Sequence, residues 1–193
     1  VISAGNTGAL LVIAKLNLKM IENIDKPALS ALWPNKKGMS VVLDLGANIE
    51  CNDKNLIDFA FMGSSLFKSL YPNEKAKVAL LNIGSEEIKG NEIIKDTYQK
   101  LNQIENSNYD FKGYIEGNEL MNGDVNVIVA DGFTGNVALK TAEGTANFIT
   151  SELKKTMSGS LIGKISIFLK IKNLKKFKKR LDPRLYNGAI FIG

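Results

Sequence analysis

Short apolar runs alternate with helix-like patterns along this chain of 193 residues, and that alternation limits the fold more than any other feature. The apolar runs predict strands over 39–46, 76–84, 109–117 and 124–131. Strands that are apolar on both faces and alternate with helices are typical of a mainly parallel sheet covered on both sides. We therefore predict an α/β fold.

Apolar residues spaced three and four positions apart predict the helices that connect these strands. The predicted helices cover 5–24, 56–70, 94–104 and about 135–157. A short extended segment is expected over 27–34, between two prolines.

The chain has no internal repeat or low-complexity linker, so residues 1–193 are predicted to form a single α/β domain. It opens without methionine and stops on an apolar run, and we expect it to be a truncated piece of a longer protein. No signal peptide or membrane-length apolar run is visible, which favours a cytoplasmic location.

Histidine is absent and cysteine occurs once, at Cys51, which restricts the available chemistry. An internal disulfide is excluded, and a zinc site of ordinary ligation is disfavoured. We expect no metal and no cofactor. Cys51 has no base beside it in the sequence, so we interpret it as a small core residue rather than a nucleophile.

Four loops share glycine, asparagine and small polar residues: 3–9, 44–50, 82–92 and 131–137. The last three follow predicted strands, and the loops at the carboxyl ends of parallel strands are where this architecture binds ligands. Glycines allow close backbone approach, and helix N-terminal amides attract anions. The alternative is that these are ordinary turn and cap residues. The candidate ligand-binding residues are Asn6, Thr7, Gly8, Asn48, Gly90, Asn91, Asp131, Gly132, Thr134 and Gly135.

Two further side chains in these loops are candidates for catalysis. Lys89 brings a cation to a loop rich in carboxylates, where it either faces an anion site or balances Glu86 and Glu87 on the surface. Asn136 supplies a neutral carboxamide donor. Asp131 either orients Lys89 or caps its turn. No loop matches the Walker pattern or the complete G-x-G-x-x-G fingerprint, so nucleotide binding has no direct support.

Five motifs in order, "SAGNTGALL", "LDLGAN", "LLNIGSEEIKGNE", "DGFTGNVALKTAEG" and "YNGAIFIG", resemble the bacterial acyl-(acyl carrier protein):phosphate acyltransferases. The resemblance runs essentially end to end. It implies a three-layer α/β/α fold related to phosphotransacetylases and the isocitrate dehydrogenase-like sheet. It also implies homodimers that move a long-chain fatty acyl group from acyl carrier protein to inorganic phosphate, giving acyl phosphate for phosphatidic acid and phospholipid synthesis. By motif, the family's catalytic lysine and asparagine fall on Lys89 and Asn136.

The resemblance further implies peripheral contact with the inner face of the membrane, where a downstream acyltransferase uses the product. The chain departs from the family in lacking its glycine-rich "GGD"-type segment and in stopping at "GAIFIG". We therefore expect part of the site to be missing and the chain to be inactive alone.

A basic amphipathic helical extension is predicted over 158–182. It could lie on an anionic membrane surface, dock the acidic carrier protein, pack in a dimer interface, or form a tertiary helix with a solvated basic face. The residues predicted to make the membrane or carrier contact are Leu161, Ile165, Phe168, Leu169, Lys170 and Lys172.

The chemistry implied by the resemblance requires little base catalysis. Phosphate is already an anionic nucleophile, and a thioester has a good leaving group because thiol pKa values lie near ~8.5. Our hypothesis is that Asn136 donates to the thioester oxygen and that Lys89 neutralises the phosphate, the oxyanion or both. The amides from Gly132 to Gly135 would complete the cradle.

Other functions remain as alternatives. A short-chain phosphotransacylase that uses coenzyme A would have a similar sheet and similar phosphate loops. A catalytically silent membrane- or carrier-binding module is also open, because both ends are expected to be missing. A dehydrogenase of the related fold is disfavoured, since no cluster of metal-binding aspartates is found. Nucleic-acid binding is disfavoured because basic and aromatic residues are not interleaved on one face.

Overall fold

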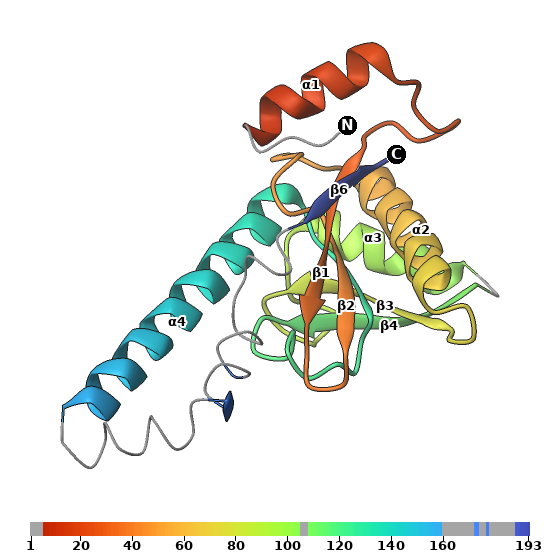
Figure 1. The fold of residues 1–193 in the computed structure, drawn as a ribbon. Helices are drawn as coiled ribbons and strands as arrows, with labels where there is room; N and C mark the ends of the chain where they lie inside the picture. The colour runs from red at the N-terminus through yellow and green to blue at the C-terminus, as the bar shows by residue number, and fades with distance from the viewer. Residues whose placement is uncertain (1–5, 105–107, 160–171, 174–176, 178–187) are drawn as a thin grey trace. The chain divides into compact units, whose positions relative to one another are not determined.

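The computed structural model of the chain describes residues 6–104, 108–159, 172–173, 177 and 188–193. Its centre is a six-stranded sheet with the strand order β4-β3-β5-β2-β1-β6 (Figure 1). The strands are β1 (Ala28–Pro34), β2 (Met39–Leu43), β3 (Ala76–Asn82), β4 (Tyr109–Glu116), β5 (Val127–Val129) and β6 (Ala189–Ile192). The four runs predicted as strands are therefore confirmed, although β5 is shorter than the predicted 124–131.

Four neighbouring strands, β4, β3, β5 and β2, run parallel to one another. β1 is antiparallel to both of its neighbours, β2 and β6. The α/β class with a mainly parallel sheet is thus confirmed. The central strands read as continuous apolar runs because both of their faces are covered, and Val78, Val127 and Val41 are fully buried.

The helices are α1 (Thr7–Asn17), α2 (Asp53–Leu70), α3 (Glu92–Gln103) and α4 (Gly132–Ser158). The prediction of one helix over 5–24 was wrong in extent. Leu18 has extended backbone angles and Asn23 has a positive φ of 66°, so the chain leaves helical geometry after Asn17. α4 begins three residues earlier than predicted, at Gly132.

α2 connects β2 to β3 and packs across β5, the strand that lies between them. A reciprocal cap starts the helix, since the Asn52 side chain accepts from the Asn55 amide at 2.8 Å and the Asn55 side chain accepts from the Asn52 amide at 3.1 Å. A Cβ added to Gly63 would lie 2.6 Å from a Leu43 methyl and 2.7 Å from a Val127 methyl. The helix therefore lies as close to the sheet as a glycine permits.

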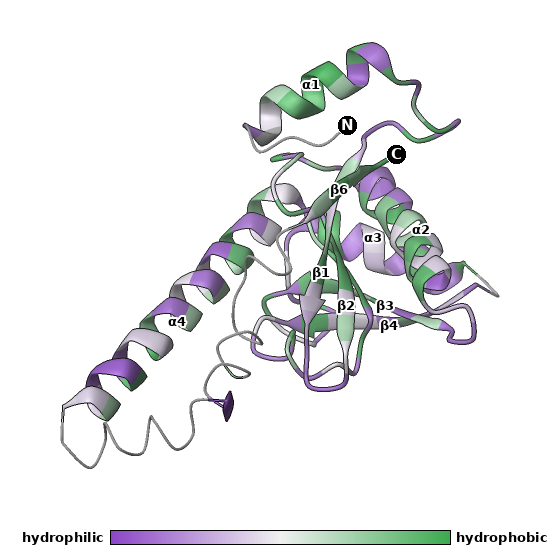
Figure 2. Cartoon of the chain, viewed as in Figure 1, coloured by the Kyte–Doolittle hydropathy of each residue, from purple (hydrophilic) through white to green (hydrophobic). Residues whose placement is uncertain are grey.

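The apolar face of α2 and the central strands form the core. Figure 2 shows α2 carrying both hydrophobic and hydrophilic residues, and the buried ones include Leu56, Phe59 and Phe67. α3 packs beside α2 and against β3 and β4. Cys51 is buried in the same core, which confirms its interpretation as a core residue.

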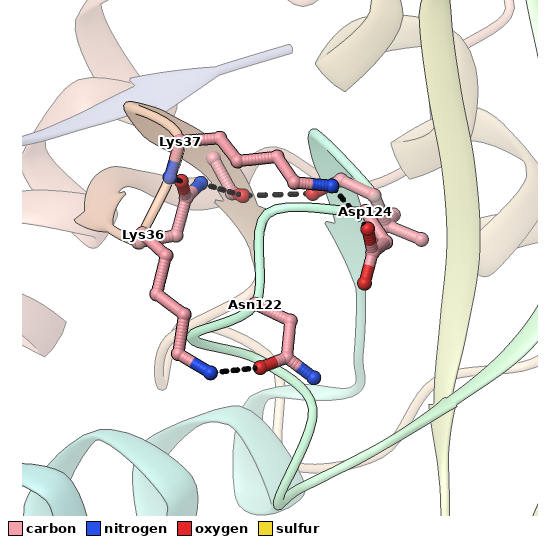
Figure 3. A network of polar contacts seen from close by, with 7 residues as sticks. Lys36, Lys37, Asn122 and Asp124 are labelled. Carbon is pink, nitrogen blue, oxygen red and sulfur yellow. Dashed lines mark hydrogen bonds and ion pairs between the residues drawn. The ribbon is translucent and has the colours of Figure 1, made fainter.

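A polar network closes the amino end of the parallel strands (Figure 3). Lys36 and Lys37, in the turn between β1 and β2, bind Asn122 and Asp124 in the loop that precedes β5. Beneath them Ser40 donates to the Val125 carbonyl at 2.9 Å. These contacts hold the β1–β2 hairpin against the loop that leads into β5. They lie at the opposite end of the parallel strands from the polar loops described below.

Two compact units make up the chain. One is Val1–Asn136 with Ala189–Gly193, and the other is Val137–Gly188. Most of the predicted basic extension lies outside the described residues, including Leu161, Ile165, Phe168, Leu169 and Lys170, whereas Lys172 is described and exposed. Among the helices that the structure describes, none is long and apolar enough to cross a membrane.

Candidate active site

Three of the polar loops predicted from the sequence follow neighbouring parallel strands at the same end of the sheet. Val129 of β5 pairs with Leu80 of β3 on one side and with Leu43 of β2 on the other, and all three strands run in the same direction. β2 and β5 therefore end at the same level, and β3 continues to Asn82. The turn after β5 follows the strand between those that lead into the Lys89 loop and the Gly46 loop, so 44–50, 82–92 and 131–137 lie at the carboxyl ends of neighbouring parallel strands, as predicted.

Asp131 organises the central turn. Its carboxylate accepts hydrogen bonds from the Thr134 amide at 2.8 Å and the Thr134 hydroxyl at 2.7 Å, and its carbonyl accepts from the Gly135 amide at 2.9 Å. Asp131 was predicted either to orient Lys89 or to cap its turn, and in the structure it caps the turn. This capping makes the glycine-containing stretch the first turn of α4, and it explains why the helix starts at Gly132.

The first turn of α4 rests directly on the backbone of loop 44–50. The Gly132 amide donates to the Asn48 carbonyl at 2.8 Å. A Cβ on Gly132 would lie 2.6 Å from that carbonyl oxygen, and a Cβ on Gly135 would lie 2.0 Å from the Asp44 carbonyl oxygen. Both glycines are needed because two backbone segments approach without room for a side chain.

Asn136 follows Gly135 in the first turn of α4, and its carboxamide lies against Gly46. Its Nδ2 atom lies 2.7 Å from the point where a Cβ on Gly46 would stand. Gly46 has a φ of 127°, a conformation that L side chains rarely adopt. The Asn136 side chain remains exposed, so it can reach a ligand at this edge.

Asp44 lies beneath loop 44–50 and was missed as a functional residue in the sequence. It is fully buried. Its Oδ1 accepts from the amides of Leu29, Gly46 and Ala47 at 3.3, 3.2 and 2.8 Å. Its Oδ2 accepts from the Asn48 amide at 2.8 Å and from the Asn48 side chain at 2.7 Å. Burial raises the pKa of the Asp44 carboxyl, and the hydrogen bonds from Ala47 and Asn48 offset part of that rise.

Asn82 holds the loop that carries Lys89 in place through its side chain, and the sequence did not identify this role either. Its side-chain nitrogen donates to the Gly84 carbonyl at 3.2 Å and to the Lys89 carbonyl at 3.1 Å, closing the loop at both ends. Gly90 follows with a φ of 94°, and a Cβ there would lie 2.6 Å from the Asn82 oxygen. Lys89 is exposed, and its backbone is held in this turn, because its carbonyl accepts from Asn82 and its amide donates to the Glu86 carbonyl at 2.9 Å.

A shared spacing could have identified Asp44 and Asn82. Both are polar residues near the end of an apolar run, and each stands two positions before a glycine, in "LDLG" and "LNIG". A polar group at the end of a buried strand must find partners in the loop that follows.

The other predicted asparagines make local contacts. Asn6 and Asn91 cap α1 and α3, accepting from the Ala9 amide at 3.1 Å and the Ile94 amide at 2.9 Å. Thr7 and Gly8 lie in the first turn of α1. The Asn48 side chain donates to the Pro27 carbonyl at 2.8 Å as well as to Asp44, so it holds its own loop in place.

Helix N-termini and acidic side chains both lie at this edge, since Asp53 and Glu92 occupy the first turns of α2 and α3. α2, α3 and α4 all begin here, and helix N-termini carry unpaired amides and partial positive charge. The Asp44 and Asp131 carboxylates are occupied by internal donors. In the part of the chain that the structure describes, no group of three or more cysteine or acidic side chains is arranged to hold a metal ion.

Residues 1–193 match the family described as "Fatty acid synthesis protein". The chain is 84% identical over its whole length to a phosphate acyltransferase of Pelagibacter ubique, covering 58% of that protein, and 47% identical to one of Rhodospirillum rubrum, covering 55%. It thus spans a little more than half the length of these curated relatives.

Two solved structures share its fold. A phosphotransacetylase from Streptococcus pyogenes matches with a TM-score of 0.57 at 15% identity, over 74% of this chain and 48% of that one. The EutD phosphotransacetylase from Staphylococcus aureus matches with a TM-score of 0.53 at 17% identity, over 69% and 46%. The predicted relation to the phosphotransacetylase fold is confirmed.

Proposed function

Because the chain belongs to the fatty acid synthesis protein family, we propose that the full-length protein transfers a long-chain fatty acyl group from acyl carrier protein to inorganic phosphate. The product is an acyl phosphate for phosphatidic acid and phospholipid synthesis. The relatives named phosphate acyltransferase support this assignment.

One structural observation carries the proposal. Asn136 and Lys89 belong to loops that follow the adjacent parallel strands β5 and β3, at the edge where α3 and α4 begin. A neutral carboxamide donor and a cation beside helix N-termini are the groups that a phosphate and a thioester oxyanion require.

The reaction follows from these groups. An oxygen of hydrogen phosphate attacks the thioester carbon, and the carbonyl electrons move onto oxygen to form a tetrahedral intermediate. The Asn136 carboxamide donates to that oxyanion, and the Lys89 ammonium neutralises the phosphate. When the intermediate collapses, the carbon–sulfur bond breaks and the carrier thiolate takes the proton that the phosphate loses. No histidine is required, because the nucleophile is already an anion.

The remaining candidate residues bind or position the two substrates in this proposal. Asn6 and Asn91 use their side-chain oxygens in capping, so their amide nitrogens would serve as donors. Asp131 and Asn48 keep their own loops in the conformation that binds the substrates. The proposed binding set is Asn6, Thr7, Gly8, Asn48, Gly90, Asn91, Asp131, Gly132, Thr134 and Gly135.

Phosphate-dependent thiol release from palmitoyl-(acyl carrier protein), measured with the full-length protein, tests the function. We expect release to require phosphate and to be much faster than release from acetyl-coenzyme A. Faster turnover of acetyl-coenzyme A would identify a short-chain phosphotransacylase. No release from either donor, together with retained binding to vesicles or carrier protein, would identify a catalytically silent module.

We also propose that the full-length protein forms a homodimer. The exposed apolar side chains of α1 support this, since Val12, Ile13 and Leu16 are 57%, 56% and 80% exposed. Leu16→Glu should then lower the sedimentation coefficient of the full-length protein, and an unchanged dimer would contradict this interface.

Contact of the basic segment 158–182 with the inner membrane surface is a further proposal, supported by its lysine-rich sequence. A downstream acyltransferase would then take up the product at the membrane. Charged substitutions at Leu161 and Phe168 should reduce binding to anionic liposomes, and unchanged binding would contradict it.

A further inference from the structure

We infer that Asp44 is a positioning residue for the reaction, because its carboxylate fixes the loop on which the Asn136 carboxamide rests. This inference rests on the proposed function for the role of Asn136. The structural link itself is independent of it, and the experiment below separates the two.

The Asp44 carboxylate is surrounded by hydrogen-bond donors. Asp44 is fully buried, yet its two oxygens accept hydrogen bonds from four backbone amides and one side-chain amide. Each of these five groups is a donor. An ionised carboxylate can only accept, so it satisfies the whole set, whereas an amide in its place would direct an N–H group at another N–H. The loop is therefore built around an acceptor with two oxygens.

Three of these amides belong to the loop that follows Asp44. Gly46, Ala47 and Asn48 are consecutive, and all three N–H groups point inward at the Asp44 side chain. This forces the loop to curl around the carboxylate. It brings Gly46 into its positive-φ conformation and turns the Asn48 carbonyl toward α4.

Loop 44–50 in turn contacts the first turn of α4. The Asn48 carbonyl accepts from the Gly132 amide at 2.8 Å, and the bare Cα of Gly46 faces the Asn136 nitrogen. Loop 44–50 therefore supports the Asn136 carboxamide from the side of Gly46. If that loop lost its shape, the first turn of α4 would lose a hydrogen bond and the carboxamide would lose its support.

The variant Asp44→Asn tests this link, because it keeps the size of the side chain and replaces one acceptor by a donor. We expect kcat to fall on the order of 10²-fold, as for other small misplacements of a reacting group, with KM for phosphate nearly unchanged. In an Asn136→Ala background the same substitution should cost little more, because Asp44 acts through Asn136. Equal losses in both backgrounds would overturn the inference.

Amide hydrogen exchange of the full-length protein supplies a readout that does not depend on activity. We expect Asp44→Asn to speed exchange in the segments 44–50 and 131–137 together and to leave α3 unchanged. Faster exchange in 44–50 alone would mean that the loops are not linked, and faster exchange everywhere would mean a general structural role. Either result overturns the inference.

Different results would contradict the donor role of Asn136 and the link from Asp44 to Asn136. If Asn136→Ala retains normal turnover, the donor role of Asn136 in the proposed function is wrong, and the exchange data still decide the link from Asp44. If Asp44→Asn does not fold, Asn48→Ala replaces it, since this variant removes one donor to the carboxylate together with the donor to the Pro27 carbonyl. It should speed exchange in both segments to a smaller extent, and a change confined to 44–50 would overturn the link.

Discussion

The side-chain nitrogen of Asn136 lies 2.7 Å from the point where a Cβ on Gly46 would stand, although 90 residues separate the two in sequence. The contact joins the loop after β2 to the turn after β5. The candidate donor is thus held by a neighbouring loop as well as by its own helix.

Gly46→Ala should displace Asn136 and lower kcat by roughly 10- to 100-fold, because a misplaced reacting group loses its alignment. The control is Gly38→Ala. Gly38 also has a positive φ, of 154°, but a Cβ there would meet no atom within 4 Å. Both variants should lose about 1–3 kcal/mol of stability from backbone strain, and only Gly46→Ala should lose turnover. Steady-state kinetics and urea unfolding of the full-length protein measure the two effects, and equal kcat values would contradict this account.

Lys89→Met should reduce kcat/KM for phosphate by roughly 10- to 100-fold, which corresponds to the about 1.5–3 kcal/mol of a hydrogen bond to a charged group. Lys77→Met is the matched control, since Lys77 is exposed on β3, the strand that leads into the Lys89 loop, but near its opposite end. Phosphate titrations of thiol release compare them. If both lysines have the same effect, general surface charge explains it and Lys89 has no special role.

The strands and their loops could be predicted because a buried parallel strand is apolar on both faces and must end in polar, flexible residues. The strand order could not be predicted. The position of β5 between β3 and β2 depends on pairing between distant segments, and these segments are all short apolar runs of similar composition. The start of α4 was missed because Asp131 was open to two interpretations, and only the structure shows its bonds to Thr134. The shared spacing before a glycine marks Asp44 and Asn82 as polar residues at strand ends, but only the structure shows which backbone groups of the following loops they bind.

Gly135→Ala should destabilise the fold by about 1–3 kcal/mol through overpacking, because its Cβ would lie 2.0 Å from the Asp44 carbonyl oxygen. Gly144→Ala, in the same helix, meets nothing within 4 Å and should gain up to about 1 kcal/mol from helix propensity. Urea unfolding of the two variants gives the comparison. Similar stabilities would mean that the α4 turn moves away from loop 44–50 at little cost.

Cys51 should make the free energy of unfolding fall as the pH rises above 9. Burial, with a smaller contribution from the Asp44 charge, raises the pKa of the Cys51 thiol from 9.0 to about 11. Between these values the unfolded chain loses the thiol proton while the folded chain keeps it, so deprotonation favours the unfolded state. Below pH 9 the thiol is protonated in both states and contributes no slope.

The difference in unfolding free energy between the wild type and Cys51→Ala isolates this effect from the lysines that titrate in the same range. That difference should be constant below pH 9 and should decline up to about pH 11. The native thiol should also react slowly with a disulfide reagent at neutral pH and rapidly in urea, because the thiolate is the reactive form. A constant difference throughout would contradict the raised pKa of the Cys51 thiol. Rapid labelling of the native protein would mean that the segment around Cys51, which directly follows loop 44–50, opens readily.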